Sequence, residues 1–98
     1  MSEREINILN STIEILKDKL NPDKIILFGS RAKGKSKLHS DFDIAIEISK
    51  PDLRTRRIIK EKIVDVSGLY SVDLIYLNSV DENFKNLVLK TGKTVYER

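Results

Sequence analysis

Two short stretches decide the fold of this chain: residues 25–31 read IILFGSR, and residues 40–46 read SDFDIAI. Successive side chains of a β-strand point to opposite faces. Asp41 and Asp43 therefore share one face, where their like charges repel. A divalent cation held between two carboxylates is the usual reason why a protein keeps such a pair. Gly29 adds a turn beside them whose backbone can approach phosphate groups closely.

The second stretch continues as a strand over residues 41–48 with two distinct faces. One face is apolar throughout, and we expect it in the core; it consists of Phe42, Ile44, Ile46 and Ile48. The opposite face is expected to form a polar floor; it consists of Asp41, Asp43, Ala45 and Glu47.

Outside these stretches, apolar residues spaced three and four apart predict helices. The first covers residues 3–20, the second covers residues 53–66, and the third runs from Ser79 to Gly92. Ser2 with Glu5, and Ser79 with Glu82, have the spacing of a capping box at a helix start. The side chains expected on the buried faces are Ile6, Leu9, Ile13, Leu16 and Leu20 in the first helix, Ile59, Ile63 and Val66 in the second, and Val80, Phe84, Leu87 and Val88 in the third.

The lengths of the connections predict how the strands pair. The segment between the strands at residues 24–28 and 41–48 is too short for a full crossover, so we expect these strands to be antiparallel. The segment before the next strand, residues 72–77, has room for a helix and favours a parallel pair. The end of the first strand and the starts of the other two then meet at one edge of the sheet. The residues that converge there are Gly29, Ser30, Asp41, Asp43 and Asp73.

The composition fits one small, well-solvated domain over residues 1–98. Of the 98 residues, 40% are hydrophobic and 34% are charged, which allows a modest core. The order of the elements predicts an α+β fold with an α/β-like crossover: helices packed on a small mixed β-sheet of three to four strands, the last being a short extended segment over residues 94–96. The net charge of +3 is mild and only 6% of the residues are aromatic. We therefore do not expect nucleic acid as the primary substrate.

Three absences in the sequence bear on location and redox chemistry. There is no cysteine, which excludes disulfides and thiolate metal sites. There is no apolar run of about 18 residues, as a transmembrane helix would need. Residues 1–5 read MSERE, which does not resemble a signal peptide. We expect a cytoplasmic protein with no membrane partner.

A competing motif lies in the same region. Residues 29–36 read GSRAKGKS and match the P-loop pattern G-x-x-x-x-G-K-[ST] after an apolar strand. A P-loop must lead directly into a helix whose N-terminus holds the phosphates. Only residues 37–40 separate this match from the next strand, and Asp41, Asp43 and Asp73 begin their strands, whereas a Walker-B aspartate ends one. We therefore do not interpret the match as a P-loop.

The pattern instead resembles the nucleotidyltransferases related to DNA polymerase beta. Their signature is G-S, ten to a dozen residues, D-x-D, and a third carboxylate on a later strand. Here residues 29–34 read GSRAKG, residues 40–43 read SDFD, and Asp73 supplies the third carboxylate. The chain is most similar to the minimal nucleotidyltransferases, and the resemblance runs from about Lys24 to the C-terminus, where residues 91–97 read TGKTVYE. It implies the polymerase beta-like nucleotidyltransferase fold.

The resemblance also implies a role for each matching residue. Asp41 and Asp43 would hold two Mg²⁺ ions that also bind the triphosphate of an incoming nucleotide, here ATP. Asp73 would bind the metal that activates the acceptor hydroxyl, and would take its proton. Gly29, Ser30 and Arg31 would contact the phosphates. The chemistry is consistent with this assignment, because nucleotidyl transfer needs alignment and charge neutralisation more than covalent catalysis.

The small size of the chain bears on the acceptor. Larger relatives carry a further domain that holds the acceptor, whereas here a partner surface or a second copy of the chain would have to hold it. Minimal nucleotidyltransferases are commonly antitoxins paired with a helical HEPN toxin, and the resemblance implies transfer of AMP from ATP to a tyrosine of such a partner. Two alternatives stay open at this point. One is a binding module that neutralises its partner by contact alone, and the other is transfer to a small molecule such as an aminoglycoside.

Overall fold

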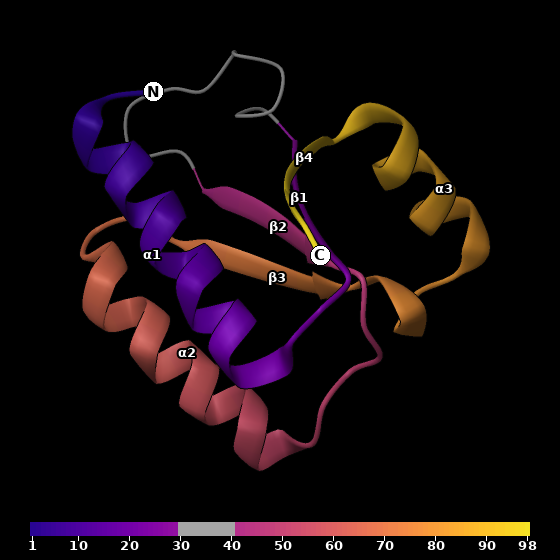
Figure 1. The fold of residues 1–98 in the computed structure, drawn as a ribbon, viewed down its shortest axis with the longest axis horizontal. Coiled ribbons are helices and arrows are strands. Elements are labelled where there is room, and N and C mark those ends of the chain that lie inside the picture. Colours follow the sequence, from indigo (N-terminus) through magenta and orange to yellow (C-terminus); the bar gives the residue numbers. More distant parts are fainter. Residues whose placement is uncertain (30–40) are drawn as a thin grey trace.

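The predicted α+β architecture is confirmed. The computed structural model describes residues 1–29 and 41–98, in which helices pack on one mixed sheet with the strand order β3–β2–β1–β4 (Figure 1). The elements in chain order are α1 (Glu3–Leu20), β1 (Lys24–Phe28), β2 (Phe42–Ile46), α2 (Leu53–Ser67), β3 (Val72–Tyr76), the short 3₁₀ helix η1 (Leu77–Ser79), α3 (Glu82–Thr91) and β4 (Lys93–Glu97). The fourth strand that the sequence suggested is therefore present.

The strand directions also agree with the prediction from connection lengths. β1 and β2 are antiparallel, with Phe28 opposite Asp43, while β2 and β3 are parallel, with Asp43 opposite Asp73. β4 adds to the other side of β1 in the antiparallel sense. The register places the end of β1 beside the starts of β2 and β3, which is the edge on which the site was expected.

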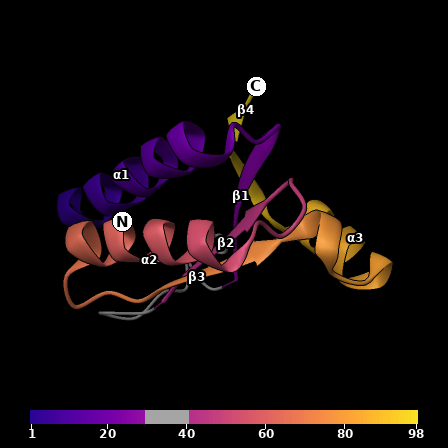
Figure 2. The ribbon, with the colours of Figure 1, turned by 90° about the horizontal axis from the view of Figure 1, so that it is seen from below.

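One face of the sheet is covered by α1 and α2, which lie side by side and run in opposite directions (Figures 1 and 2). Apolar side chains from both helices meet the alternate residues of the strands there. This main core contains Leu9, Ile13 and Leu16 of α1, Ile25 and Leu27 of β1, Phe42, Ile44 and Ile46 of β2, and Ile59 and Ile63 of α2. The apolar face predicted for β2 is thus the centre of the core.

The opposite face of the sheet is covered only in part, by α3 (Figure 2). Val88 of α3 packs with Leu77 on Ile26 and Ala45, and Phe84 meets Phe28 edge to face at 6.3 Å between ring centroids. The prediction of a polar floor along this whole face is therefore wrong at Ala45, which is fully buried. Among the described residues, this face remains exposed at Asp41 and Asp73, with Asp43 half-buried.

The helix boundaries follow the local capping chemistry. Ser2 and Glu5 form the predicted capping box at α1, and Asn21 ends that helix in the left-handed conformation. The box predicted at Ser79 and Glu82 is wrong. The α3 cap is Asp81, whose side chain accepts a hydrogen bond from the Phe84 backbone N–H, while the Ser79 hydroxyl accepts one from the Lys50 backbone N–H.

Three side chains predicted to be buried are exposed: Ile6, Val66 and Leu87. Because α1 contacts both the sheet and α2, its buried face turns toward Ile8 and Thr12. Leu87 points away because α3 meets the sheet along one narrow line.

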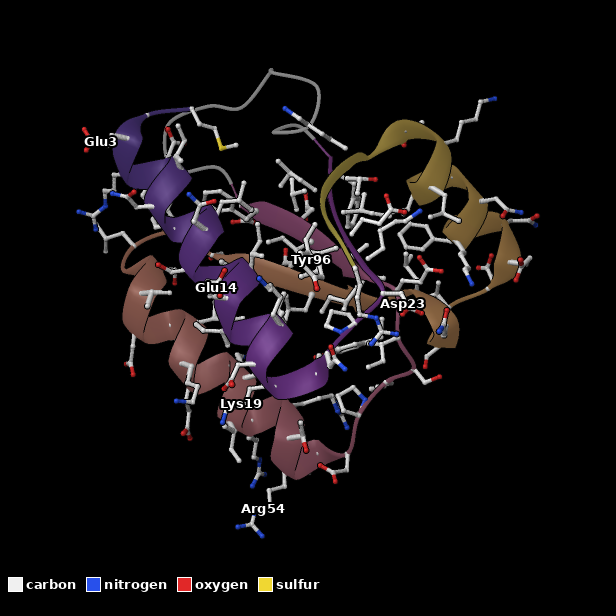
Figure 3. The ribbon with its side chains drawn as sticks, in the orientation of Figure 1. Glu3, Glu14, Lys19, Asp23, Arg54 and Tyr96 are labelled. Carbon is white, nitrogen blue, oxygen red and sulfur yellow. The ribbon has the colours of Figure 1, made fainter. Side chains whose placement is uncertain are left out.

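At the C-terminus, Arg98 pairs with Asp23, and Tyr96 lies beside α1 with the Lys17 Nζ 4.9 Å from its ring centroid (Figure 3).

Thr12 generates a stability prediction. Its hydroxyl is fully buried and has no hydrogen-bond partner in the described part of the chain. An unsatisfied buried hydroxyl costs roughly 1–3 kcal/mol, and replacement by an apolar group of the same shape removes that cost. We expect Thr12→Val to raise the free energy of unfolding by about 1 kcal/mol in urea titrations. Thr12→Ser, which keeps the hydroxyl and loses a methyl group, should lower it. A loss of stability in the valine variant would contradict the assignment.

Candidate active site

Gly29 and Asp43 are in direct apposition at the end of β1. Gly29 follows the last residue of β1 and has φ +76°, a left-handed conformation that side chains disfavour. A Cβ atom placed on it would lie 2.4 Å from the Asp43 Oδ2. Glycine is therefore required here for two reasons, the backbone conformation and the space that the carboxylate occupies.

The three aspartates project from neighbouring positions on the partly open face of the sheet. Asp43 lies on β2 directly opposite Asp73 of β3, and Asp41 comes two residues earlier, on the same side by strand alternation. Asp43 is half-buried, whereas Asp41 and Asp73 are exposed. The structure thus brings together four of the predicted site residues. Ser30 and Arg31 lie outside the described residues, as does most of the P-loop-like segment.

The electrostatics of Asp43 reflect this crowding. Burial raises the pKa of its carboxyl above the ordinary 3.8, and the negative charges of Asp73 and then Asp41 raise it further. A group whose neighbours oppose its ionisation gains from a cation placed among them. The site is therefore suited to positive charge on electrostatic grounds alone.

The donor set tests what such a cation would be. Carboxylate oxygens are hard ligands that suit Mg²⁺. Within residues 1–29 and 41–98, no three carboxylate, histidine or cysteine side chains are gathered closely enough to hold a metal ion by themselves. The aspartates fit Mg²⁺ in chemistry, and the oxygens of a bound triphosphate are the further ligands that Mg²⁺ commonly takes in enzymes that act on nucleotides.

A groove of about 530 Å³ adjoins the site and was not foreseen from the sequence. It lies between α2 and β3 and reaches Asp73. Its lining includes the cations Arg56 and Lys60 and the apolar side chains of Val64 and Leu69. The spacing of four between Arg56 and Lys60 was a visible signal, because it places both on one face of α2.

Comparison with known proteins agrees with the fold. The family described as "Polymerase beta, Nucleotidyltransferase" matches residues 10–98. The chain is a nucleotidyltransferase domain, and it belongs to this polymerase beta family. No helix in the described ranges, residues 1–29 and 41–98, has the length and apolar character needed to cross a bilayer.

Two curated relatives are similar over most of their length. The chain is 31% identical to the probable protein adenylyltransferase MntA of Haemophilus influenzae, over 96% of this chain and 87% of that protein. It is 35% identical to a putative protein adenylyltransferase of Methanocaldococcus jannaschii, over 83% of this chain and 84% of that protein.

Solved structures with the same fold include toxin–antitoxin complexes. A toxin–antitoxin crystal structure with AMP-PNP superimposes with a TM-score of 0.77 and 28% identity, covering 91% of this chain and 73% of that one. A tri-AMPylated HEPN toxin of Shewanella oneidensis in complex with an MNT antitoxin gives a TM-score of 0.70 and 26% identity, covering 97% and 73%. The resemblance to minimal nucleotidyltransferases is therefore confirmed.

The raised pKa of Asp43 predicts a pH-dependent effect on stability. Because the folded pKa lies above the ordinary 3.8, ionised Asp43 opposes folding, and stability falls as pH rises through the folded pKa. We expect Asp43→Asn to be more stable than the wild type at about pH 7, and this advantage to vanish below about pH 3.8. Urea titrations at both pH values measure the difference. Asp65→Asn on the exposed side of α2 is the control, and a pH-independent gain in Asp43→Asn would contradict the prediction.

Gly29→Ala should disturb the Asp43 carboxylate. The left-handed backbone costs an alanine about 1–2 kcal/mol, and the new methyl group must also displace Oδ2. We expect a lower free energy of unfolding together with a changed ¹³C shift of the Asp43 carboxyl group in NMR spectra. Gly68→Ala is the control, because Gly68 also has positive φ but faces only the flexible end of Arg4. We expect Gly68→Ala to lower the free energy of unfolding without changing the ¹³C shift of the Asp43 carboxyl group. An unchanged Asp43 shift in Gly29→Ala would contradict the close approach of Gly29 and Asp43.

Proposed function

We propose that this chain is a Mg²⁺-dependent protein adenylyltransferase that transfers AMP from ATP to a tyrosine of a HEPN-type toxin and so acts as its antitoxin. The observation that carries the proposal is the row of Asp41, Asp43 and Asp73 beside the glycine turn at Gly29. The two curated relatives and the AMPylated toxin complex support the reaction and the partner. We treat residues 1–98 as one catalytic domain, because α1 packs into the same core as the sheet.

Each site residue has a part in the proposed reaction. Asp41 and Asp43 would hold two Mg²⁺ ions, with Asp73 as a further ligand to one of them. When bound, the ions would neutralise the triphosphate and lower the pKa of the attacking hydroxyl. Gly29 leaves room for the Asp43 carboxylate, and its backbone would approach the phosphates closely. Ser30 is predicted to donate hydrogen bonds to the departing pyrophosphate, and Arg31 to be a further phosphate contact.

The transfer itself is an in-line displacement at phosphorus. The tyrosine oxygen forms a bond to the α-phosphorus, and the bond from that phosphorus to the oxygen bridging to the β-phosphorus breaks. The electron pair of the broken bond leaves with pyrophosphate, and the phenolic proton passes to Asp73. Asp73 is exposed beside Asp43, so it can reach an incoming hydroxyl. We expect the pair to act in the cytoplasm, where ATP is available.

A transfer assay with α-labelled ATP tests the proposal. Purified chain, Mg²⁺ and the HEPN-type protein from the same genome should give a labelled partner, and chelation of the metal should abolish the label. Asp43→Asn should lower the rate at least about a hundredfold, because it removes a carboxylate that would hold the Mg²⁺ ions needed to neutralise the transition-state charge. Asp65→Asn is the matched control and should label the partner like the wild type.

A binding measurement separates catalysis from contact. Sedimentation of the mixed proteins should show that Asp43→Asn still binds the partner, so that the lost label reports chemistry. Equal labelling by the wild type and Asp43→Asn would overturn the proposed activity. A double variant, Asp41→Ala with Asp43→Ala, that still neutralises the toxin would show instead that the chain acts by contact alone.

A further inference from the structure

The outer edge of β3 presents backbone groups that no other described strand uses. β3 is the last strand of the sheet on the side away from β4 (Figure 2). The Ser71 carbonyl accepts a hydrogen bond from the Phe42 backbone N–H, so alternate residues from Ser71 direct their backbone groups toward β2. Val72 and Leu74 therefore direct their N–H and C=O groups outward. Within residues 1–29 and 41–98 these groups have no backbone partner.

The groove between α2 and β3 follows this edge along its full length. α2 runs opposite to β3, so the two ends of the groove differ in character (Figure 1). Leu69 and Val64 make it apolar near Val72, where Leu69 is 81% exposed. Arg56 lines the groove together with Tyr76 and contributes a positive charge to it. Lys60 also lines the groove and forms no ion pair with a described carboxylate.

We infer that this edge and groove bind an extended acceptor segment of the partner protein, which pairs with β3 as an added strand and carries acidic side chains toward Arg56 and Lys60. The inference rests on the proposed function and specifies its acceptor subsite. A polypeptide is the fitting occupant, because only a peptide backbone offers alternating N–H and C=O groups that match those of Val72 and Leu74. A nucleic acid has no such ladder.

The register of an added strand explains how the acceptor would reach the catalytic residues. Directly opposed residues in neighbouring strands point to the same face, with Cβ atoms about 4.5–5.5 Å apart. A tyrosine opposite Asp73 would therefore extend the row that Asp43 and Asp73 already form. Its immediate neighbours would point to the other face, into the apolar part of the groove. Residues three positions away would lie opposite Tyr76 and beside Arg56.

This geometry defines a probe. It is a short synthetic peptide with a central tyrosine flanked on each side by valine, then threonine, then glutamate, so that either strand direction places glutamate near Arg56. A peptide with lysine in place of glutamate tests the charge requirement. Binding is measured without ATP by fluorescence anisotropy, and the amide signals of Val72 and Leu74 in NMR spectra report the location. We expect the acidic peptide to bind and to shift both signals, and the basic peptide to bind at least about tenfold more weakly.

Two matched pairs of variants test the edge and the groove. Lys60→Glu should weaken peptide binding about tenfold, whereas Lys62→Glu changes net charge equally on an exposed position outside the groove and should have less than about a twofold effect. Val72→Pro removes one outward N–H at the first residue of an edge strand, where proline is tolerated. It should weaken binding about fivefold, equivalent to one hydrogen bond. Val72→Ala keeps the N–H and should bind like the wild type.

The outcomes separate this inference from the proposed function. Loss of binding in Lys60→Glu and Val72→Pro, with both controls intact and all variants folded by circular dichroism, supports it. If none of the four substitutions changes the affinity for the peptide, the inferred acceptor subsite is overturned, even if label transfer to the HEPN-type protein succeeds. A short single-stranded RNA that binds with Lys60 dependence while the peptide does not would also overturn it. Failure of transfer alone would refute the enzyme activity and leave the peptide binding result in place.

Discussion

The register of β2 is the constraint on which the rest of the structure depends. This central strand pairs with β1 on one side and β3 on the other, so Asp43 has Phe28 and Asp73 as its direct neighbours. A slip by one residue would turn Phe42, Ile44 and Ile46 out of the core and turn the carboxylates into it. The apolar face of β2 thus fixes the positions of Asp41 and Asp43 and sets Asp43 beside Asp73.

The same strand brings together groups that repel one another. Burial and the negative charges of Asp73 and Asp41 all disfavour ionisation of the Asp43 carboxyl and raise its pKa. The free-energy cost of this charge repulsion is confined to one face of β2. It is offset by the opposite face of the strand, where three large side chains are fully buried. Each such side chain contributes roughly 1.5–3 kcal/mol through burial. A small domain can therefore hold a destabilising charge cluster because the strand that carries the cluster is also the best-packed strand.

Much of this arrangement was predictable because it depends on local periodicity and chain length. Alternation identified the two faces of β2, and connection lengths identified the antiparallel and parallel pairs that bring Asp73 to Asp43. The predictions were wrong where burial and capping depend on contacts between residues far apart in the sequence. Ala45 is covered because α3 returns over it, Leu87 is exposed because α3 makes only a narrow contact, and the cap fell on Asp81 because Ser79 bonds to Lys50 instead. The α2–β3 groove likewise depends on how a helix settles against an edge strand.

The two edges of the sheet differ in a way that bears on function. Exposed edge strands invite unwanted pairing, and charged side chains are a common protection. β4 carries Lys93 and Glu97 at its ends, and Glu97 forms an ion pair with Lys24 across the strand pair. β3 is apolar except for Asp73. The Asp73 carboxylate therefore affects which strand can pair with this edge. An apolar residue or a carboxylate opposite Asp73 would be disfavoured, whereas a hydroxyl group could donate a hydrogen bond to the Asp73 carboxylate. The residue assigned to the acceptor proton would then also discriminate which segment can pair there.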